Sequence, residues 1–376
     1  MKTVKTLLLI TSVVLVSPCI ISQSTHPEPA TLHIGSKAPD FMLRGVDGNT
    51  YSLNDFNNAK VLVIIFSCNH CPTAQAYEDR IITLANDYRP KGVEVIMISP
   101  NSVAALNYSE LGYSDMGDSF EEMKVRAADK KFPFPYLYDG ETQATALAYG
   151  PAATPHCFVF DKDRILRYTG RVDASEKPGT GHGEDIRNAV DAVLDGREVA
   201  TPVTKVFGCS VKWSWKNEYT KKLYKEWSEL PVTLEEIGAT EIRALIKNNS
   251  DRVRLINIWA TWCGPCLAEM PDLIIIDRMY RNRAFEFVTI SADKQDRKEE
   301  VLRILKLNEA SNKNYIFNKD DVYELIEAVD PEWQGALPYT MLIEPEGNIL
   351  YKKQDTIDPH EMKKLIVGSR YLGRYY

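Results

Sequence analysis

Two cysteine pairs with the spacing C-x-x-C, Cys68–Cys71 and Cys263–Cys266, most constrain what this chain can fold into. Each pair follows an apolar run typical of a buried strand, at 61–66 and 255–259, and precedes a helical pattern. A disulfide within C-x-x-C closes a tiny loop and constrains almost no chain, so these pairs are not structural staples. The sequence therefore indicates two repeated units, each built around a reactive thiol pair.

The repeat extends well beyond the cysteines. Three further features recur in the same order in both copies: a strand, a proline that precedes a strand and hairpin, and a final helix. In the first copy they lie at 93–98, Thr154-Pro155 and 184–194. In the second copy they lie at 285–290, Leu337-Pro338 and 359–367. This order is typical of layered domains with a mixed sheet. We therefore expect an α/β fold of two similar domains, each a mixed central sheet flanked by helices.

Length and composition agree with two globular domains. With 376 residues, 44% of them hydrophobic and 26% charged, the chain can fill two cores. We expect a signal peptide at 1–22, domains at 32–200 and 233–370, and a connector at 201–232 that is ordered because it is neither Gly/Ser-rich nor Pro-rich. The net charge of −7, without a basic cluster, argues against nucleic acid as a partner.

The first residues are typical of an export signal. Lys2 and Lys5 precede an apolar run at 7–16, which is too short to span a bilayer as a helix. Cys19 follows where a bacterial lipoprotein would carry its acyl chain, and cleavage near 22–24 without lipid fits equally well. We expect an exported, periplasmic protein, and the sequence leaves open whether a lipid anchor at Cys19 tethers it to the membrane.

Two stretches resemble known families. Residues 259–271, WATWCGPCLAEMP, resemble the active site of exported thioredoxin-like reductases of the TlpA/ResA type, and this similarity extends over 233–370. Residues 34–41, IGSKAPDF, are similar to the opening of the redoxin branch related to alkyl hydroperoxide reductases. The resemblance implies two thioredoxin-like domains and a thiol–disulfide oxidoreductase, a disulfide reductase with antioxidant activity. Its only cofactors would be its redox-active cysteine disulfides.

Thiol exchange requires a thiolate, which a free cysteine supplies poorly at neutral pH. At the start of a helix, unpaired N–H groups and the positive end of the helix dipole stabilise the thiolate form of a cysteine. We therefore predict that Cys68 and Cys263 are the exposed nucleophiles, with pKa values below that of a free thiol. Cys71 and Cys266 would resolve the mixed disulfides.

Neighbouring residues are expected to tune each pair. His70, between the first two cysteines, would donate to the thiolate, stabilise the reduced form and make that disulfide more oxidising; the alternative is a solvated cap of the helix turn. Glu269 matches an active-site acid of the TlpA/ResA group and would accept the proton of the resolving thiol; the alternative is a solvated carboxylate. Trp262, directly before Cys263, is expected to contact substrate.

The two recurrent prolines are expected to form the substrate-binding edge of each site. The resemblance implies that Pro155 and Pro338 are cis and lie against the cysteine pairs. A cis proline would leave the backbone of the preceding residue, Thr154 or Leu337, free to pair with a substrate segment. The alternative is that both prolines are trans and simply begin ordinary strands.

Two cysteines fall outside the pairs. Cys157 lies on an expected strand, where a small buried apolar residue would serve equally well, and we interpret it as core. Cys209 lies in the connector among aromatic and basic residues. It is a candidate accessory thiol, a third partner in disulfide exchange, and an idle free thiol is the equal alternative.

Other chemistries fit the cysteines less well. Structural zinc would need both pairs in one cluster, whereas each lies in its own repeat, so we expect no metal. Covalent haem attachment needs a histidine directly after the pair, where this chain has Pro72 and Leu267. A binding protein with inactive thioredoxin folds conflicts with four intact cysteines. A peroxidase of the peroxiredoxin type is the second hypothesis. It ranks below the reductase because peroxiredoxins place a proline and a threonine shortly before the reactive cysteine, and residues 63–67 of this chain contain neither.

The expected partners follow from this chemistry. They are protein disulfide substrates and a membrane-bound or soluble thiol reductant. Because His70 would make the first pair more oxidising than the second, electrons would pass from Cys263 to the first site. The sequence thus predicts two C-x-x-C sites that work as an internal electron relay.

Overall fold

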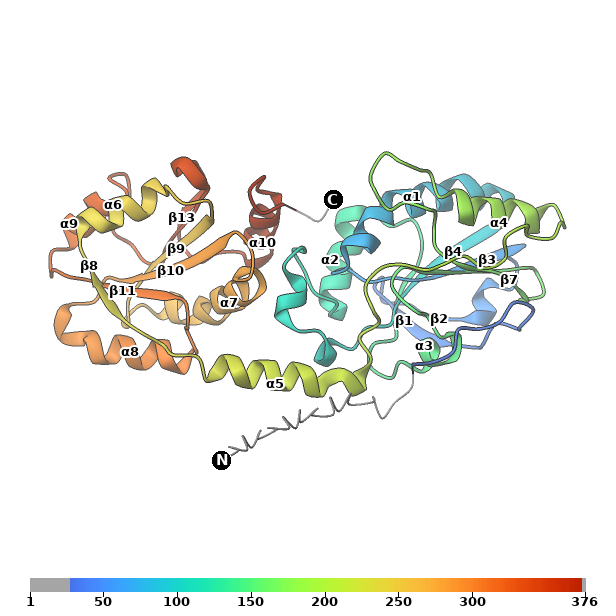
Figure 1. The fold of residues 1–376 in the computed structure, drawn as a ribbon, viewed down its shortest axis with the longest axis horizontal. Coiled ribbons are helices and arrows are strands. Elements are labelled where there is room, and N and C mark those ends of the chain that lie inside the picture. The colour runs from blue at the N-terminus through green and yellow to red at the C-terminus, as the bar shows by residue number, and fades with distance from the viewer. Residues whose placement is uncertain (1–27, 374–376) are drawn as a thin grey trace, which may run out of the picture.

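A computed structural model describes residues 28–373 of the chain. It contains two separate β-sheets with helices packed around each, and helix α5 (Asn217–Ser228) runs between them (Figure 1). The expected fold class, two α/β domains with mixed sheets, is confirmed. The predicted signal peptide at 1–22 and Cys19 lie outside the described residues, and the predicted domain bounds stay predictions.

The first sheet has seven strands in the order β2-β1-β5-β4-β3-β6-β7. These strands are Met42–Gly45 (β1), Thr50–Ser52 (β2), Val61–Phe66 (β3), Val93–Ser99 (β4), Tyr136–Tyr138 (β5), His156–Phe160 (β6) and Leu166–Gly170 (β7). Strand β3 runs parallel to β4 and antiparallel to β6, and all its side chains are buried. A strand covered on both faces needs a continuous apolar run, which explains the sequence VLVIIF.

Four α-helices belong to this first domain: Pro72–Tyr88 (α1), Phe120–Lys130 (α2), Ala144–Tyr149 (α3) and Glu184–Leu194 (α4). The helix expected at 184–194 has those bounds. Helix α2 begins with a capping box, in which Ser119 and Glu122 satisfy each other's backbone N–H groups. Apolar clusters fill both faces of the sheet.

The second sheet has six strands in the order β13-β12-β9-β10-β11-β8. Its strands are Glu235–Ile237 (β8), Val253–Trp259 (β9), Phe285–Ser291 (β10), Lys313–Phe317 (β11), Tyr339–Ile343 (β12) and Ile349–Gln354 (β13). Its helices are Ala239–Lys247 (α6), Gly264–Tyr280 (α7), Lys298–Leu307 (α8), Val322–Val329 (α9) and Pro359–Gly368 (α10). The central strand β9 pairs with β10 in parallel and with β12 in antiparallel orientation, as β3 does in the first sheet.

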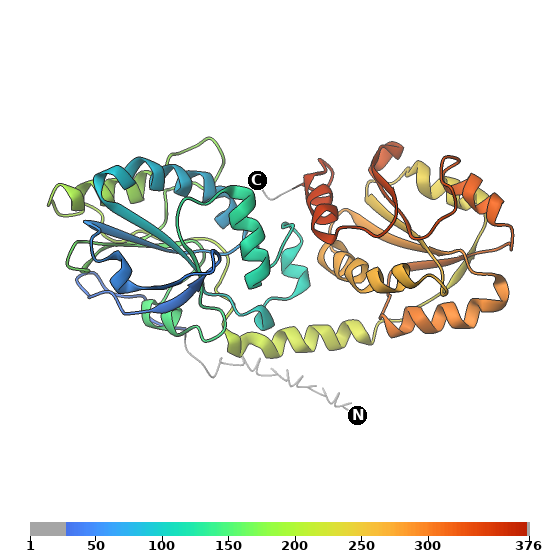
Figure 2. The same cartoon turned by 180° about the vertical axis from the view of Figure 1, so that it is seen from behind.

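A segment of the first domain, residues 100–119 between β4 and α2, packs against the second domain (Figure 2). Leu106 and Leu111 belong to the apolar core around α7. The Tyr280 hydroxyl donates to the Ser114 carbonyl at 2.7 Å, and Arg283 donates to the Gly112 carbonyl at 2.7 Å. The docking insert, as we call residues 100–119, therefore joins the two domains through both apolar and polar contacts.

The connector follows the first domain before it becomes helix α5. Trp213 is buried in the core on one face of the first sheet and stacks on Trp215, with ring centroids 4.9 Å apart. On α5, Tyr224 stacks against Tyr108 of the docking insert at 5.2 Å. Across residues 28–373, no helix combines the length and apolar character needed to cross a membrane.

Candidate redox-active sites

The first cysteine pair lies between β3 and α1, but the helix begins later than expected. Cys71 is the N-cap residue of α1, which starts at Pro72, and the Cys71 sulfur accepts the Ala74 N–H at 3.5 Å. Cys68 therefore precedes the helix, and the helix dipole acts on Cys71. The prediction that Cys68 is the thiol at the helix start is wrong.

Both cysteines of this pair are buried. Cys68 is 2% exposed and Cys71 is fully buried, so the expectation of an exposed Cys68 nucleophile is also wrong. Burial raises the pKa of Cys68 well above its usual range, and a hydrogen bond with Cys71 adds to the effect. For Cys71 burial also favours the neutral thiol, but hydrogen bonds from Cys209 and Cys68 and the nearby His70 charge outweigh it. The pKa of Cys71 is therefore lowered well below its usual range, in the opposite direction to that of Cys68.

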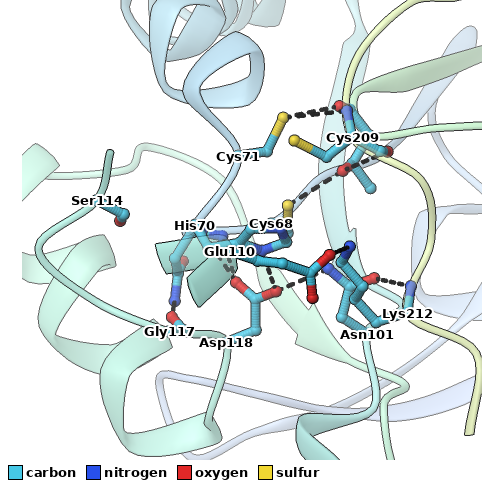
Figure 3. A network of polar contacts seen from close by, with 12 residues as sticks. Cys68, His70, Cys71, Asn101, Glu110, Ser114, Gly117, Asp118, Cys209 and Lys212 are labelled. Carbon is cyan, nitrogen blue, oxygen red and sulfur yellow. Dashed lines mark hydrogen bonds and ion pairs between the residues drawn. The ribbon is translucent and has the colours of Figure 1, made fainter. Parts of the chain in front are cut away.

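His70 is held by a buried carboxylate and not by solvent. Its Nδ1 lies 2.6 Å from Asp118 Oδ2, and both side chains are buried (Figure 3). Burial alone would lower the pKa of His70, but the charge and hydrogen bond of Asp118 overcome this and raise it. Burial opposes ionisation of Asp118 as well, and His70 keeps the pKa of Asp118 below its usual value. The solvated-cap alternative for His70 is therefore wrong. The expected hydrogen bond from His70 to the thiolate is also wrong, because Nδ1 bonds to Asp118 and Nε2 has no hydrogen-bond partner among the described residues. His70 acts on Cys71 through its charge.

Asp118 also holds the loop that carries the pair. Its Oδ1 accepts the backbone N–H groups of Asn69 at 2.9 Å and His70 at 3.1 Å, and its Oδ2 accepts Asn101 Nδ2 at 2.7 Å. The loop N–H groups thus bond to a carboxylate from the docking insert and not to a helix. This explains why α1 begins only after Cys71.

One group of buried side chains in the described part of the chain has donor atoms close enough to hold a metal ion. It comprises Cys68, His70 and Asp118, whose ligand atoms lie within 4.8 Å of one another. Asp118 already accepts bonds from Asn69, Asn101 and both the backbone and ring of His70, so its oxygens are fully used. We interpret Asp118 as the residue that orients His70, and the expectation of a metal-free site stays a prediction.

The two prolines lie in the predicted geometry. The Thr154–Pro155 and Leu337–Pro338 peptide bonds are cis, which confirms that expectation. Thr154 Oγ1 lies 3.1 Å from the Cys68 sulfur, and the Cys71 thiol, when protonated, donates to the Thr154 carbonyl at 3.2 Å. The loop before Pro155 therefore contacts both cysteines of the first pair.

The second pair lies at the start of a helix, as the sequence predicts, but Cys263 is buried, so the expectation of an exposed Cys263 is wrong. Cys263 is the N-cap residue of α7, and its sulfur accepts the Cys266 N–H at 3.2 Å. The two cysteines form a disulfide. Cys263 is 5% exposed, whereas the adjacent Trp262 is 68% exposed. The exposed Trp262 thus lies beside the buried pair, and its expected contact with substrate stays a prediction.

Glu269 lies on the buried face of α7. Its oxygens accept Asn257 Nδ2 at 2.9 Å and the Ile357 N–H at 3.0 Å. Burial raises the pKa of Glu269 above its usual value, although both hydrogen bonds oppose the shift. The solvated alternative is wrong, and the protonation role predicted for Glu269 stays a prediction.

The remaining cysteines differ in their surroundings. Cys157 lies on β6, next to β3 in the sheet, and is fully buried in the core. Burial raises its pKa, in agreement with its interpretation as a core residue. Cys209 is half-buried and packs against Cys68, Cys71 and Ala74 (Figure 3). The structure thus brings a third thiol to the first site.

Sequence reasoning missed the residues that the docking insert supplies. Asp118 and Asn101 come from a segment without strand or helix periodicity, and no motif marks them. The sequence could have predicted that α1 begins at residue 72. Proline is favoured at the first helical position, and Pro72 directly follows Cys71.

Comparisons with known proteins match each domain to a family. Residues 34–169 match the AhpC/TSA family, and residues 228–366 match the Redoxin family. The thiol–disulfide oxidoreductase ResA of Bacillus subtilis (strain 168) is 23% identical over 155 residues, which cover 40% of this chain and 81% of that protein.

Two solved structures each cover half of the chain. A hypothetical protein from Sinorhizobium meliloti 1021 is 33% identical, with a TM-score of 0.44, over 50% of this chain and 98% of that one. An uncharacterized conserved protein from Geobacillus kaustophilus is 42% identical, also with a TM-score of 0.44, over 50% of this chain and 96% of that one. From the two family matches and the ResA relatives, the chain consists of two thioredoxin-fold domains of the AhpC/TSA and Redoxin families and is an oxidoreductase related to the thiol–disulfide oxidoreductases.

Proposed function

We propose that this protein is an exported disulfide reductase with two C-x-x-C redox sites, the second of which acts on protein clients. The observation that carries the proposal is the second site, where Cys263 lies at the N-terminus of α7 beside the exposed Trp262. Within residues 28–373, no backbone hydrogen bond involves Leu337, the residue before the second cis-proline. That backbone is available to an extended client segment.

The second site supports a two-step exchange. In the reduced pair, the Cys263 thiolate is stabilised by the Cys266 N–H and attacks one sulfur of a client disulfide. A mixed disulfide forms, and the other client sulfur leaves as a thiolate. Cys266 then gives up its proton and attacks Cys263, which closes the Cys263–Cys266 disulfide and releases the client dithiol. The client gains two electrons, and a thiol reductant must restore the pair.

The first site is proposed to receive electrons from the second. Its reduced form is stabilised because Cys71 accepts hydrogen bonds and lies near the charged His70, and a stabilised reduced form makes a disulfide more oxidising. The second pair encloses Gly264 and Pro265 and has no such histidine. This difference supports an internal relay from Cys263 to the first site.

Export to the periplasm is proposed from the N-terminal sequence alone. The charged residues Lys2 and Lys5 and the apolar run at 7–16 support a signal peptide, and Cys19 would be the site of any lipid anchor. Fractionation of cells that express the full chain, with Cys19→Ala as the comparison, would test both points. A protein found only in the cytoplasm would contradict export.

Reduction of insulin disulfides by the purified chain tests the function directly. We expect Cys263→Ser to lower the rate at least about 100-fold, because the nucleophile is lost. Cys157→Ala, which removes a core thiol, should retain most of the activity. Hydrogen peroxide consumption is measured with the same reductant, and turnover of peroxide as fast as that of insulin would favour the peroxidase hypothesis instead.

A further inference from the structure

The residue before the first cis-proline is already paired with another segment of the same chain. The Thr154 N–H donates to the Cys209 carbonyl at 2.9 Å, and the two residues form an antiparallel bridge. The Thr154 hydroxyl also donates to that carbonyl at 3.4 Å. In the second domain the equivalent backbone, that of Leu337, has no such partner among residues 28–373. The connector thus occupies in the first domain the position that is open in the second.

The thiol of this connector segment lies at the redox pair. The Cys209 N–H donates to the Cys71 sulfur at 3.3 Å, and the Cys209 thiol forms a side-chain hydrogen bond with Cys71. Cys68 and Cys71 are 2% and 0% exposed, whereas Cys209 is half-buried. Cys209 is therefore the most accessible of the three thiols.

The chain is shaped for this close approach at Gly208. Its φ is +145°, and a Cβ added there would lie 2.0 Å from the Thr154 carbonyl oxygen. Only glycine fits such a contact between two backbones. On the other side of Cys209, the Lys212 N–H donates to Asn101 Oδ1 at 2.9 Å, and the Lys212 carbonyl accepts the Ser102 N–H at 2.9 Å. Both ends of the segment are thereby fixed to the first domain.

We propose that residues 207–210 occupy the peptide-binding groove of the first site as an intramolecular substrate, and that Cys209 is a third redox-active cysteine that forms a disulfide with Cys71. The proposal deepens the proposed thiol-exchange function and depends on it. It means that the first site exchanges electrons with the outside through Cys209, while the groove itself is closed to client segments.

The exchange balances without a further oxidant. When the first site is oxidised as Cys68–Cys71, the Cys209 thiol loses its proton and attacks the Cys71 sulfur. The Cys71–Cys209 disulfide forms, the Cys68–Cys71 bond breaks, and Cys68 leaves as a thiolate that takes up a proton. An external thiol then attacks Cys209 and releases the Cys71 thiolate, and a second thiol resolves the mixed disulfide. Two external thiols become one disulfide, and the site regains its reduced thiols.

Disulfide mapping of the full chain tests this assignment. Cys68→Ser is reduced, oxidised with glutathione disulfide, trapped by alkylation and digested for mass spectrometry. We expect a linked Cys71–Cys209 peptide as the main product of the first site, and Cys68→Ser/Cys209→Ser as the control should give a glutathione adduct on Cys71 instead. Glutathione adducts on both Cys71 and Cys209 of the single variant, without the linked peptide, would overturn the proposal.

A glycine substitution tests the groove without removing a thiol. Gly208→Ala should displace the segment, so that Cys71–Cys209 linkage falls at least about fivefold and alkylation of Cys71 becomes faster. Gly368→Ala is the matched control, because a Cβ there meets no atom within 4 Å. Linkage and alkylation rates unchanged in Gly208→Ala would overturn occupation of the groove. Insulin reduction by the second site, measured in the same variants, separates failure of this inference from failure of the proposed function.

Discussion

At the scale of single residues, the two cysteine pairs differ in which cysteine lies at the N-terminus of the following helix. Cys263 is the N-cap of its helix, whereas in the first domain the N-cap is Cys71. The hydrogen bonds and charge around Cys71 lower its pKa, while burial raises the pKa of Cys68. The same C-x-x-C spacing therefore places the first cysteine of one pair and the second cysteine of the other at the helix N-terminus.

Asp118→Asn tests the charge arrangement around Cys71. Asp118 raises the pKa of His70 against the effect of burial. Asp118→Asn should therefore lower the pKa of His70, so that the imidazole loses its proton at a lower pH. Cys71 then lacks a positive neighbour at neutral pH, and its titration should move to higher pH. The ultraviolet absorbance of the thiolate, followed against pH in a chain with Cys263 and Cys266 changed to serine, measures this. Asp163→Asn, in an exposed turn, is the control, and equal midpoints for both variants would contradict the prediction.

At the scale of elements, buried ion pairs fix the helices around the first site. Arg126 on α2 donates from Nε and Nη2 to the two oxygens of Glu78 on α1, at 2.8 and 2.6 Å. Both side chains are buried. Burial raises the pKa of Glu78, and the Arg126 charge opposes that shift. The pair thus anchors α2, which follows directly after Asp118, to the helix that begins at the cysteines.

Arg126→Met should lower the free energy of unfolding by about 3–5 kcal/mol, because it removes both hydrogen bonds to a buried carboxylate and leaves only Lys130, whose Nζ lies 3.6 Å from Glu78 Oε2. Glu78 would then have a folded-state pKa above its unfolded value, so it binds a proton more tightly in the folded protein. The loss of unfolding free energy caused by Arg126→Met should therefore become smaller as the pH falls from neutrality. Denaturant unfolding at several pH values measures this. Lys124→Met removes an exposed pair with Glu121 and the contact of the ammonium group with the Phe120 ring, and it should cost about 1 kcal/mol or less. A similar loss in both variants would contradict the argument.

At the scale of the whole molecule, the docking insert connects the helix of the second site to the loop of the first. Tyr280 near the end of α7 donates to the Ser114 carbonyl, and the Ser114 hydroxyl accepts Gln75 Nε2 at 3.0 Å. The same Gln75 amide donates to the Asn69 carbonyl at 2.6 Å, between the cysteines of the first pair. A continuous series of hydrogen bonds therefore holds the two redox units in one arrangement.

The internal relay predicts a difference in reduction potential between the sites. The first site should be more oxidising than the second by about 30 mV or more, which corresponds to about 1.4 kcal/mol. Chains that retain only one pair, with the other changed to serine, are titrated against glutathione. Asp118→Asn in the chain with the first pair alone should reduce the gap, because it removes the charge support of Cys71. A first site that is equally or more reducing than the second would leave the relay without a driving force.

Much of this molecule follows from local sequence patterns. The apolar run of β3, the helical period of α4 and the repeat of proline-led strands are each contained in a short stretch, so the fold class and the cysteine pairs could be predicted. That the two prolines are cis was implied by the family resemblance. Such patterns work because burial and hydrogen bonding along one element constrain residues that are neighbours in the chain.

Only the tertiary structure decided which thiol is activated and what fills the first groove. Asp118 lies 48 residues from His70 and Cys209 lies 138 from Cys71, and neither separation leaves a periodic signal. Asp118 accepts hydrogen bonds from the backbone N–H groups of Asn69 and His70, so the helix begins only after Cys71. Gly208 has no side chain, so the connector can lie directly against the Thr154 carbonyl. The sequence alone determines the two redox units, because their elements are local, whereas contacts between distant segments determine how the first unit differs from the second.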